Sequence, residues 1–331
     1  MVNMKEKNIL IAGGAGYIGS HMVLALLEKG YHPVIFDNLS EGHREAVHGG
    51  TFIKGDLADG NKLRETFHTY NISAVMHFAA NCYVGESVTN PRKYYENNVF
   101  NTFNLINVMQ ECGIDKFIFS SSCATYGNPI HLPLKEDHPQ NPINPYGNTK
   151  LVVEKILHDY GNAYDFFSIS LRYFNAAGAD PQSRTGENHS PETHLIPNVI
   201  NAALGINSTV KIFGNDYDTP DGTCIRDYIH VMDLAQAHLL ALEKLLNGYK
   251  TDFFNLGNGA GYSNKQIVET VEKVTGKKIS VEKASRRAGD PPILVGSSEK
   301  AKRDLGWNPE YATLEKIIET AWNWHLKLNR K

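Results

Sequence analysis

The sequence predicts an α/β protein built on a doubly wound parallel sheet, followed by a smaller mixed α/β region. Apolar runs alternate with helical patterns through the first half, and runs such as 9–11 and 117–119 are apolar without interruption. After Asn175 the chain becomes rich in Gly, Pro, Ser and Asn. Alternating strands and helices indicate parallel strands with crossover helices, and strands covered on both faces have continuous apolar runs.

The first half accounts for most of the expected sheet. Expected strands are 8–12, 32–37, 51–54, 74–78, 116–120 and 168–173, because each is a short apolar run bounded by turn residues. Expected helices are 17–29, 61–70, 91–112 and 146–160. The last follows Asn144-Pro145, since Asn is a good helix N-cap and Pro suits the first helical position.

The second half is expected to leave this sheet and return to it. We expect a loop over 176–194, then a helix (196–204), a strand (210–213) and a second loop (214–222). A helix over 233–246 and a strand over 252–256 are expected to rejoin the main sheet. This organisation predicts one domain formed by 1–175 with 226–258, and a second formed by 176–225 and 259–331.

The composition narrows the class of protein. The 331 residues are 41% hydrophobic and 21% charged, which is typical of a globular protein of one large or two modest domains. A net charge of −3 gives no electrostatic reason to expect nucleic acid or an acidic membrane as partner. Residues 1–8 lack the apolar core of a signal peptide, so we expect a cytoplasmic location.

Cysteines and histidines do not follow familiar ligand spacings. The four cysteines (Cys82, Cys112, Cys123 and Cys224) are scattered and form no CxxC pair, which favours reduced thiols over a disulfide framework. The fourteen histidines include no HExxH pattern. We therefore expect no metal.

A glycine-rich turn, Gly13–Gly19, joins the first expected strand to the first helix. Such a turn lets backbone N–H groups approach a pyrophosphate at the helix N-terminus, as in Rossmann-type folds. Asp37 ends the second strand about 20 residues later, where a carboxylate binds an adenosine ribose and repels a 2′-phosphate, so NAD is expected rather than NADP. Asp56 follows the third strand, where it could meet the adenine. The alternative is a tight structural turn with surface aspartates.

Tyr146 and Lys150 lie four residues apart, so they share one face of the expected helix. A phenol loses its proton near pH 10, and a nearby positive charge lowers that pKa. Ser122 closes the run Phe119-Ser-Ser-Ser at a strand end, where ligands of doubly wound sheets bind. A hydroxyl there can assist proton transfer. The alternative is two ordinary helix residues beside a serine run that satisfies backbone groups.

These features together resemble the extended short-chain dehydrogenase/reductase superfamily and, within it, the UDP-glucose 4-epimerase family. The similarity runs nearly from end to end, and its specific segments are 94–99, 119–122, 172–175, 213–217, 226–233 and 286–290. The last three carry most weight, because they lie outside the dinucleotide-binding half, where members of the superfamily diverge.

The resemblance implies an isomerase of galactose metabolism that interconverts UDP-galactose and UDP-glucose through a 4-keto sugar, using bound NAD. It implies that Tyr146 removes the sugar 4-OH proton, that Lys150 lowers the phenol pKa and holds the nicotinamide ribose, and that Ser122 bridges to the 4-OH. It also implies a homodimer that pairs through the helices 91–112 and 146–160.

The resemblance further implies two sets of binding residues. The NAD set is Gly13, Gly16, Tyr17, Ile18, Gly19, Asp37, Asn38, Asp56, Leu57, Phe78, Ala79, Ala80, Asn97, Ser122, Tyr146, Lys150 and Phe174. The UDP-sugar set is Ser122, Tyr146, Asn175, His194, Leu195, Lys211, Ile212, Phe213, Arg226, Arg287, Asp290 and Leu294. Its two arginines suit a pyrophosphate, because a guanidinium pairs with phosphate through forked hydrogen bonds.

Three positions depart from the family pattern. Cys82 stands where many members have Lys, so a contact to the cofactor phosphate is missing or replaced. His194 stands where some members have Asn. Leu294 stands where members narrow for glucose and galactose have Tyr, and members with a small residue there often accept N-acetylated sugars. Leu294 therefore suggests the hypothesis that the chain also interconverts UDP-GlcNAc and UDP-GalNAc.

Three rival functions stay open. A nucleotide-sugar 4,6-dehydratase needs an acid and a base, and its pattern resembles Thr-Asp-Glu at this strand end. Here Ser122-Cys123-Ala124 stand instead, so both carboxylates are missing. A uronic-acid 4-epimerase would need only a change in a substrate loop. A non-catalytic NAD-binding sensor would keep the glycine turn but would not need the Tyr146/Lys150 pair.

Overall fold

The computed structural model, which describes residues 7–286 and 291–330, contains a seven-stranded parallel sheet. Its strand order is β11-β6-β5-β4-β1-β2-β3, so the direction of winding reverses between β1 and β4. The strands are β1 (Asn8–Ala12), β2 (His32–Asp37), β3 (Thr51–Lys54), β4 (Ile72–His77), β5 (Lys116–Ser122), β6 (Phe167–Tyr173) and β11 (Asp252–Leu256). The predicted doubly wound α/β fold is confirmed.

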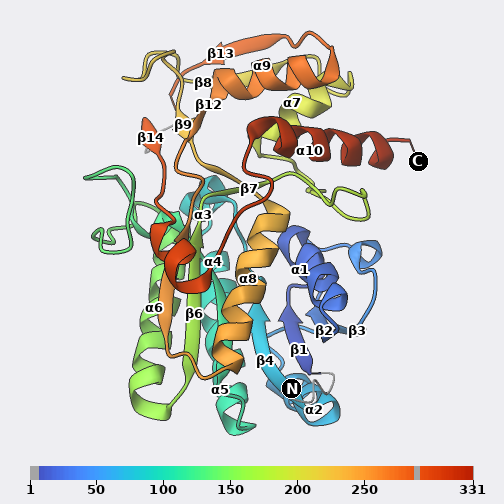
Figure 1. The fold of residues 1–331 in the computed structure, drawn as a ribbon, viewed down its shortest axis with the longest axis vertical. Coiled ribbons are helices and arrows are strands. Elements are labelled where there is room, and N and C mark those ends of the chain that lie inside the picture. Colours follow the sequence, from blue (N-terminus) through green and yellow to red (C-terminus); the bar gives the residue numbers. More distant parts are fainter. Residues whose placement is uncertain (1–6, 287–290, 331) are drawn as a thin grey trace.

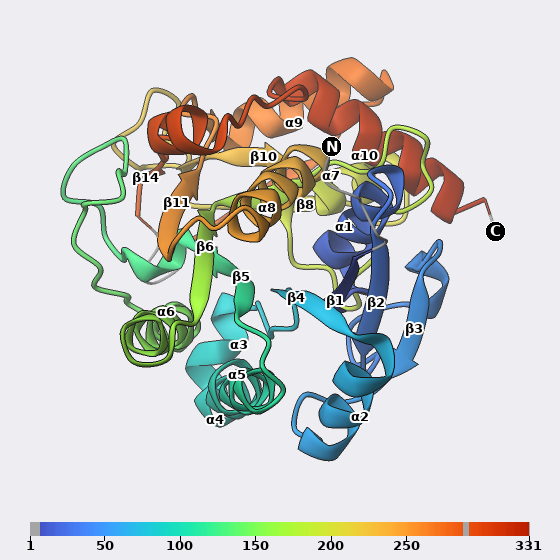
Figure 2. The ribbon, with the colours of Figure 1, turned by 60° about the horizontal axis from the view of Figure 1, so that its bottom comes forward.

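Helices cover both faces of this sheet, as Figures 1 and 2 show. On one face lie α1 (Tyr17–Glu28) and α8 (Val231–Leu246), and on the other lie α2 (Gly60–Tyr70), α5 (Asn101–Glu111) and α6 (Pro145–Tyr164). Within β1, Ile9 belongs to the core beneath α8, and Leu10 belongs to the core beneath α5. Alternate residues of a strand point to opposite faces, so burial of both faces explains the continuous apolar run.

The expected return to the main sheet is confirmed. Strand β11 pairs in parallel with β6, from Asp252 opposite Ile169 to Leu256 opposite Tyr173. Helix α8 packs beside α1 and over β5 and β6. The chain therefore leaves the main sheet after β6, enters the smaller region, and returns to complete the sheet with β11.

The expected helix 91–112 is present but interrupted. It consists of α4 (Pro91–Tyr95), a π-helical turn (Glu96–Phe100) and α5. A π turn inserts one residue into the helical repeat and is frequent at functional sites. Here Asn97 lines the main cavity, while Asn98 turns to accept a hydrogen bond of 2.8 Å from the backbone N–H of Asn81. Before it lies the short helix α3 (Val84–Thr89).

The smaller region lies above the sheet in Figure 1 and has its own apolar core. Its helices are α7 (Leu195–Ala203), α9 (Asn264–Thr275) and α10 (Leu314–Leu328). Its paired strands are β7 (Asn175–Ala177) with β10 (Tyr228–His230), β8 (Val210–Phe213) with β13 (Val281–Ala284), and β9 (Ile225–Arg226) with β12 (Tyr262–Ser263) and β14 (Ile293–Leu294). Across the described ranges, no helix combines the length and apolar character that crossing a membrane requires.

Candidate active site

A cavity of about 1490 Å³ lies between the carboxyl ends of the sheet strands and the smaller region. It exceeds the about 300–1,000 Å³ of a pocket for one drug-sized ligand, so it has room for two ligands side by side. With three exceptions described below, all the residues predicted to bind NAD or UDP-sugar line this cavity. Cys82, one of the departures from the family pattern, lines it as well.

The glycine-rich turn closes one end of the cavity with no space for side chains. A Cβ atom on Gly13 would lie 2.5 Å from the backbone nitrogen of Ala79, and one on Gly19 would lie 2.2 Å from the carbonyl oxygen of Gly13. Gly16 is the N-cap of α1 and provides no side-chain cap for the first N–H groups. The helix N-terminus therefore faces the cavity as an anion-binding group.

Polar side chains at the ends of β2 and β3 continue this end of the cavity. The buried carboxylate of Asp37 accepts hydrogen bonds from the N–H groups of Ala15 (2.9 Å) and Leu39 (2.8 Å). Burial raises the pKa of Asp37, and these two hydrogen bonds oppose that shift. Asn38 donates to Asp56 at 2.8 Å, so these neighbouring loops carry hydrogen-bonding groups on the cavity wall.

Strand β5 and helix α6 bring together the three predicted catalytic residues. The Oδ1 atom of Asn144 caps α6 by accepting from Gly147, which confirms the predicted start of the helix. Tyr146 and Lys150 then line the cavity together with Ser122, from the carboxyl end of β5. Local capping and helical spacing thus account for this grouping.

The ionisation of this group differs from the expectation. Lys150 is buried, and burial lowers its pKa to about 8. Its Nζ donates to the carbonyl oxygen of Ser120 at 2.8 Å and lies 5.8 Å from the centre of the Tyr146 ring. Desolvation raises the pKa of the Tyr146 phenol well above its usual value, and a hydrogen bond with Ser122 only partly opposes this. Burial therefore dominates the ionisation of the phenol, and the Lys150 ammonium group is directed to a backbone carbonyl.

A buried ion pair fixes α6 to the sheet. Glu154, two turns after Tyr146 on the same helix, faces Arg172 of β6, with nitrogen–oxygen distances of 2.6 to 3.2 Å. The Ser121 hydroxyl donates to the same carboxylate, and Arg172 also donates to the hydroxyl of Tyr126 at 2.9 Å. The helix that carries the catalytic pair is therefore tied to both β5 and β6.

Predicted substrate residues line the other part of the cavity, with three exceptions. The side chain of Ile212 is buried in the core of the smaller region, because adjacent residues of β8 point to opposite faces and its neighbours Lys211 and Phe213 line the cavity. Its assignment to the substrate site stays a prediction. The other two exceptions, Arg287 and Asp290, lie outside the described residues.

Two groups near the cavity were not predicted as functional. The first is Asp227, a fully buried carboxylate next to Arg226 that accepts from the N–H groups of Asn258, Gly259 and Gly296 at 2.9 to 3.2 Å. Burial raises its pKa to about 6. The sequence signal that could have identified Asp227 is its place in the segment 226–233, which matches the family pattern. Asp227 holds the end of β9 to the loop after β11 and to the loop after β14, and so positions Arg226.

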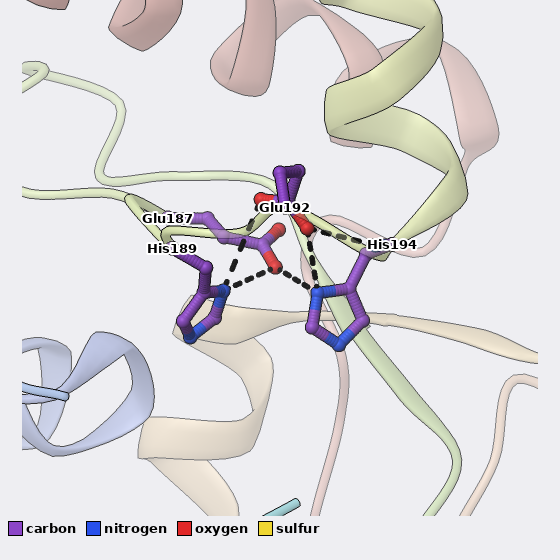
Figure 3. Close-up of side chains that lie close together, drawn as sticks. All are labelled: Glu187, His189, Glu192 and His194. Carbon is purple, nitrogen blue, oxygen red and sulfur yellow. Dashed lines mark hydrogen bonds and ion pairs between the residues drawn. The ribbon is translucent and has the colours of Figure 1, made fainter. Parts of the chain in front are cut away.

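The second group is a cluster of Glu187, His189, Glu192 and His194 in the loop before α7 (Figure 3). Nδ1 of His194 lies 2.8 Å from Glu187 and 2.9 Å from Glu192. Desolvation lowers the pKa of His194, but the two carboxylates outweigh it and raise the pKa well above its usual value. Of these four residues, only His194 was predicted to belong to the site, from the family pattern.

Known proteins match this chain over nearly its whole length. A family model described as GDP-mannose 4,6 dehydratase matches residues 10–320. A UDP-glucose 4-epimerase of Halalkalibacterium halodurans is 54% identical over 317 residues, which is 96% of this chain and 95% of that relative. The chain belongs to the UDP-glucose 4-epimerase family. The predicted resemblance is therefore confirmed.

Solved structures of this family agree in fold. The crystal structure of a UDP-glucose 4-epimerase from Brucella ovis in complex with NAD has a TM-score of 0.94 and 50% identity, covering 96% of this chain and 98% of that one. The UDP-Glc/GlcNAc 4-epimerase from Campylobacter jejuni has a TM-score of 0.84 and 43% identity, with 97% and 99% covered.

Proposed function

We propose that this protein is an NAD-dependent UDP-glucose 4-epimerase, which interconverts UDP-galactose and UDP-glucose through a 4-keto sugar. The observation that carries the proposal is the grouping of Ser122, Tyr146 and Lys150 in a cavity large enough for a dinucleotide and a nucleotide-sugar. In this proposal, 1–175 with 226–258 holds NAD, and 176–225 with 259–331 holds the UDP-sugar.

The residues present fit NAD. The glycine-rich turn Gly13–Gly19 has no space for a Cβ atom at Gly13 or Gly19, so its backbone lies close to the cavity. Its backbone N–H groups suit a pyrophosphate at the N-terminus of α1. The Asp37 carboxylate at the end of β2 suits the adenosine ribose, with Asp56 and Asn38 beside it. When bound, NAD supplies the hydride acceptor and donor for C4 of the sugar.

The catalytic residues of the chain handle the proton. Tyr146 takes the proton of the sugar 4-OH and returns it, while the Ser122 hydroxyl holds the same oxygen in place. Because the pKa of the Tyr146 phenol is raised, a nearby positive charge is needed to stabilise the phenolate. The Lys150 ammonium group, 5.8 Å from the centre of the Tyr146 ring, favours the phenolate because opposite charges attract. Lys150 is therefore the residue that offsets desolvation.

The activity is tested by incubating the protein with UDP-galactose and following UDP-glucose. The variant Tyr146→Phe should lose about 10²–10⁴-fold in turnover, the usual contribution of a positioned acid–base group, with NAD still bound. The matched control is Tyr70→Phe, at the end of α2 and outside the cavity lining. Near-normal turnover by Tyr146→Phe would refute the assigned base, and no conversion by the unmodified protein would refute the function.

We also propose that N-acetylated substrates, UDP-GlcNAc and UDP-GalNAc, are interconverted. Leu294 of β14 lines the cavity, and a small residue there leaves space for a C2 substituent. The similarity to the Campylobacter jejuni UDP-Glc/GlcNAc 4-epimerase supports this. No turnover of UDP-GlcNAc at concentrations where UDP-galactose turns over would reject it.

A homodimer that pairs through α4–α5 and α6 is the assembly we propose. Large apolar side chains stand exposed on these helices: Phe100 is 64% exposed, Phe103 39% and Tyr164 54%. Such a patch favours a protein partner. Analytical ultracentrifugation should give a dimer, and Phe100→Glu with Phe103→Glu should give monomers. A monomeric unmodified protein at micromolar concentration would overturn the proposal.

The location we propose is the cytoplasm. All four cysteines are free thiols in the structure, which supports a reducing compartment. Cell fractionation with an antibody to the protein should recover it with cytoplasmic markers; recovery in an exported fraction would contradict this.

A further inference from the structure

The loop between β7 and α7 gathers four potential metal ligands within eight residues. Glu187, His189, Glu192 and His194 direct their polar ends to one point, as Figure 3 shows. Glu187 is buried and the other three are partly buried. Within the described residues, both carboxylates form their ion pairs with these two histidines. The chemistry of the group is therefore set within the loop itself.

The spacing of the four ligand atoms matches a small tetrahedral cation. With bonds of about 2.1 Å to nitrogen and oxygen, a tetrahedral zinc site separates its ligand atoms by about 3.4 Å. His194 Nδ1 lies 2.8 Å from Glu187 Oε1 and 2.9 Å from Glu192 Oε1. His189 Nδ1 lies 3.1 Å from Glu187 Oε1 and 3.9 Å from Glu192 Oε2. These histidine–carboxylate distances bracket the tetrahedral separation, and one ligand atom from each of the four side chains lies within 4.8 Å of the others, so modest side-chain shifts would complete the site.

We propose that Glu187, His189, Glu192 and His194 bind one divalent cation, with Zn²⁺ the best match. Two imidazoles and two carboxylates form an N₂O₂ set, and zinc accepts both ligand types in tetrahedral geometry. Two carboxylates and two neutral imidazoles together balance the charge of a dication inside the protein. Because the chain fills all four positions, the site is structural and leaves no open position for catalysis.

The cation would fix the loop that forms one wall of the substrate cavity. The first two residues of the cluster already have anchors: Trp324 of α10 donates to the carbonyl oxygen of Glu187 at 2.8 Å, and the ring of His189 packs edge-on against Tyr17 and Tyr83. His194 lines the cavity and is the N-cap of α7.

Metal binding would also fix the tautomer of His194. A cation on Nδ1 leaves the proton on Nε2, which lies on the side of the ring away from the carboxylates in Figure 3. The structural cation would thereby set a hydrogen-bond donor at the cavity wall. The earlier expectation of no metal relied on HExxH and CxxC spacings, whereas this loop has Glu-x-His-x-x-Glu-x-His.

The test measures metal on the purified holoenzyme. After dialysis against a chelator, the protein is titrated with ZnSO₄, separated from free metal by gel filtration and analysed by atomic emission. One equivalent per chain is expected. Loading with CoSO₄ instead should give the intense visible absorption of tetrahedral Co²⁺. Retention of no metal by the unmodified protein, or an octahedral Co²⁺ spectrum, would overturn the proposal.

Variants identify the ligands. His189→Gln and Glu192→Gln should each weaken zinc binding by more than the about 10–100-fold that loss of an outer-sphere partner costs. His48→Gln and Glu319→Gln, both exposed and outside the cluster, should bind zinc like the unmodified protein. Circular dichroism checks that each variant is folded. Unchanged zinc binding by folded His189→Gln and Glu192→Gln would assign the metal elsewhere, for example to cysteines, and would also overturn the proposal. Epimerase activity is measured separately, so its loss cannot be mistaken for loss of metal.

Discussion

The buried pair Glu154–Arg172 gives the sharpest test of how the catalytic helix is held. Replacing Glu154 by Gln keeps the size of the side chain but removes its charge, leaving the Arg172 guanidinium buried without a counter-ion. The side chains are 7% and 3% exposed, so water cannot solvate the remaining charge. Removing one partner of such a pair typically costs about 3–5 kcal/mol of unfolding free energy.

That cost can be converted into a change in melting temperature. Unfolding entropy of about 2.1 cal/mol/K per residue gives about 0.7 kcal/mol/K for the 331 residues. The expected fall in Tm is therefore about 4–7 °C. Because Glu154 lies on the helix that carries Tyr146 and Lys150, turnover should fall as well, while the loss of stability persists in the presence of substrate.

Differential scanning calorimetry with bound NAD measures the shift, and the double variant Glu154→Gln/Arg172→Met separates the pair from the lone charge. The double variant should recover part of the stability, because it removes the buried charge that the single variant leaves uncompensated. A Tm change below about 1 °C in Glu154→Gln would refute the reasoning, since it would mean that the arginine is solvated or paired elsewhere.

Three further predictions follow from the cavity and its supporting layers. Gly19→Ala should destabilise the protein by about 1–3 kcal/mol and reduce retained NAD, measured after denaturation by absorbance, because the new Cβ would sit 2.2 Å from a backbone oxygen. Leu294→Tyr should reduce UDP-GlcNAc turnover by at least about tenfold relative to UDP-galactose, and an unchanged ratio would contradict a role for this position in selectivity. Burial lowers the pKa of His238 to about 4, below its unfolded value near 6.5, so its contribution to stability is complete above about pH 6.5 and is lost as the pH falls toward 4. Denaturant titrations at pH 6 and pH 5 measure how the free energy of unfolding changes with pH. This change should be smaller by about 1 kcal/mol per pH unit in His238→Gln than in the unmodified protein. Equal changes in the two proteins would contradict this assignment.

The features predictable from the sequence were local ones. The start of α6 followed from Asn144-Pro145, and the shared face of Tyr146 and Lys150 followed from helical spacing alone. The strands of the main sheet were predictable because burial on both faces makes them apolar throughout. Strands β2 and β3 match their expected bounds, because turn residues delimit them on both sides.

Features that depend on contacts distant in sequence were not predictable. The π-helical turn at Glu96–Phe100 inserts one residue into an otherwise continuous helix, and the hydrogen bond beside it joins Asn98 to Asn81, 17 residues earlier in the chain. The role of Asp227 depends on hydrogen bonds from backbone N–H groups that lie about 30 and 70 residues away in the chain. The direction of the Ile212 side chain depends on which face of β8 packs against α7. The sequence of a four-residue strand does not determine that packing.

The return of β11 to the sheet constrains how this protein can be shortened. A fragment ending at residue 175 would contain the glycine turn and the catalytic residues, and it would look complete from its motifs. It would nevertheless leave β6 as a bare edge, with backbone donors and acceptors unpaired along Ile169–Tyr173 where β11 now binds. It would also uncover Leu171, which now packs in the core with residues of α8. An unprotected, apolar edge strand recruits other chains, so such a fragment should aggregate rather than bind NAD as an independent unit.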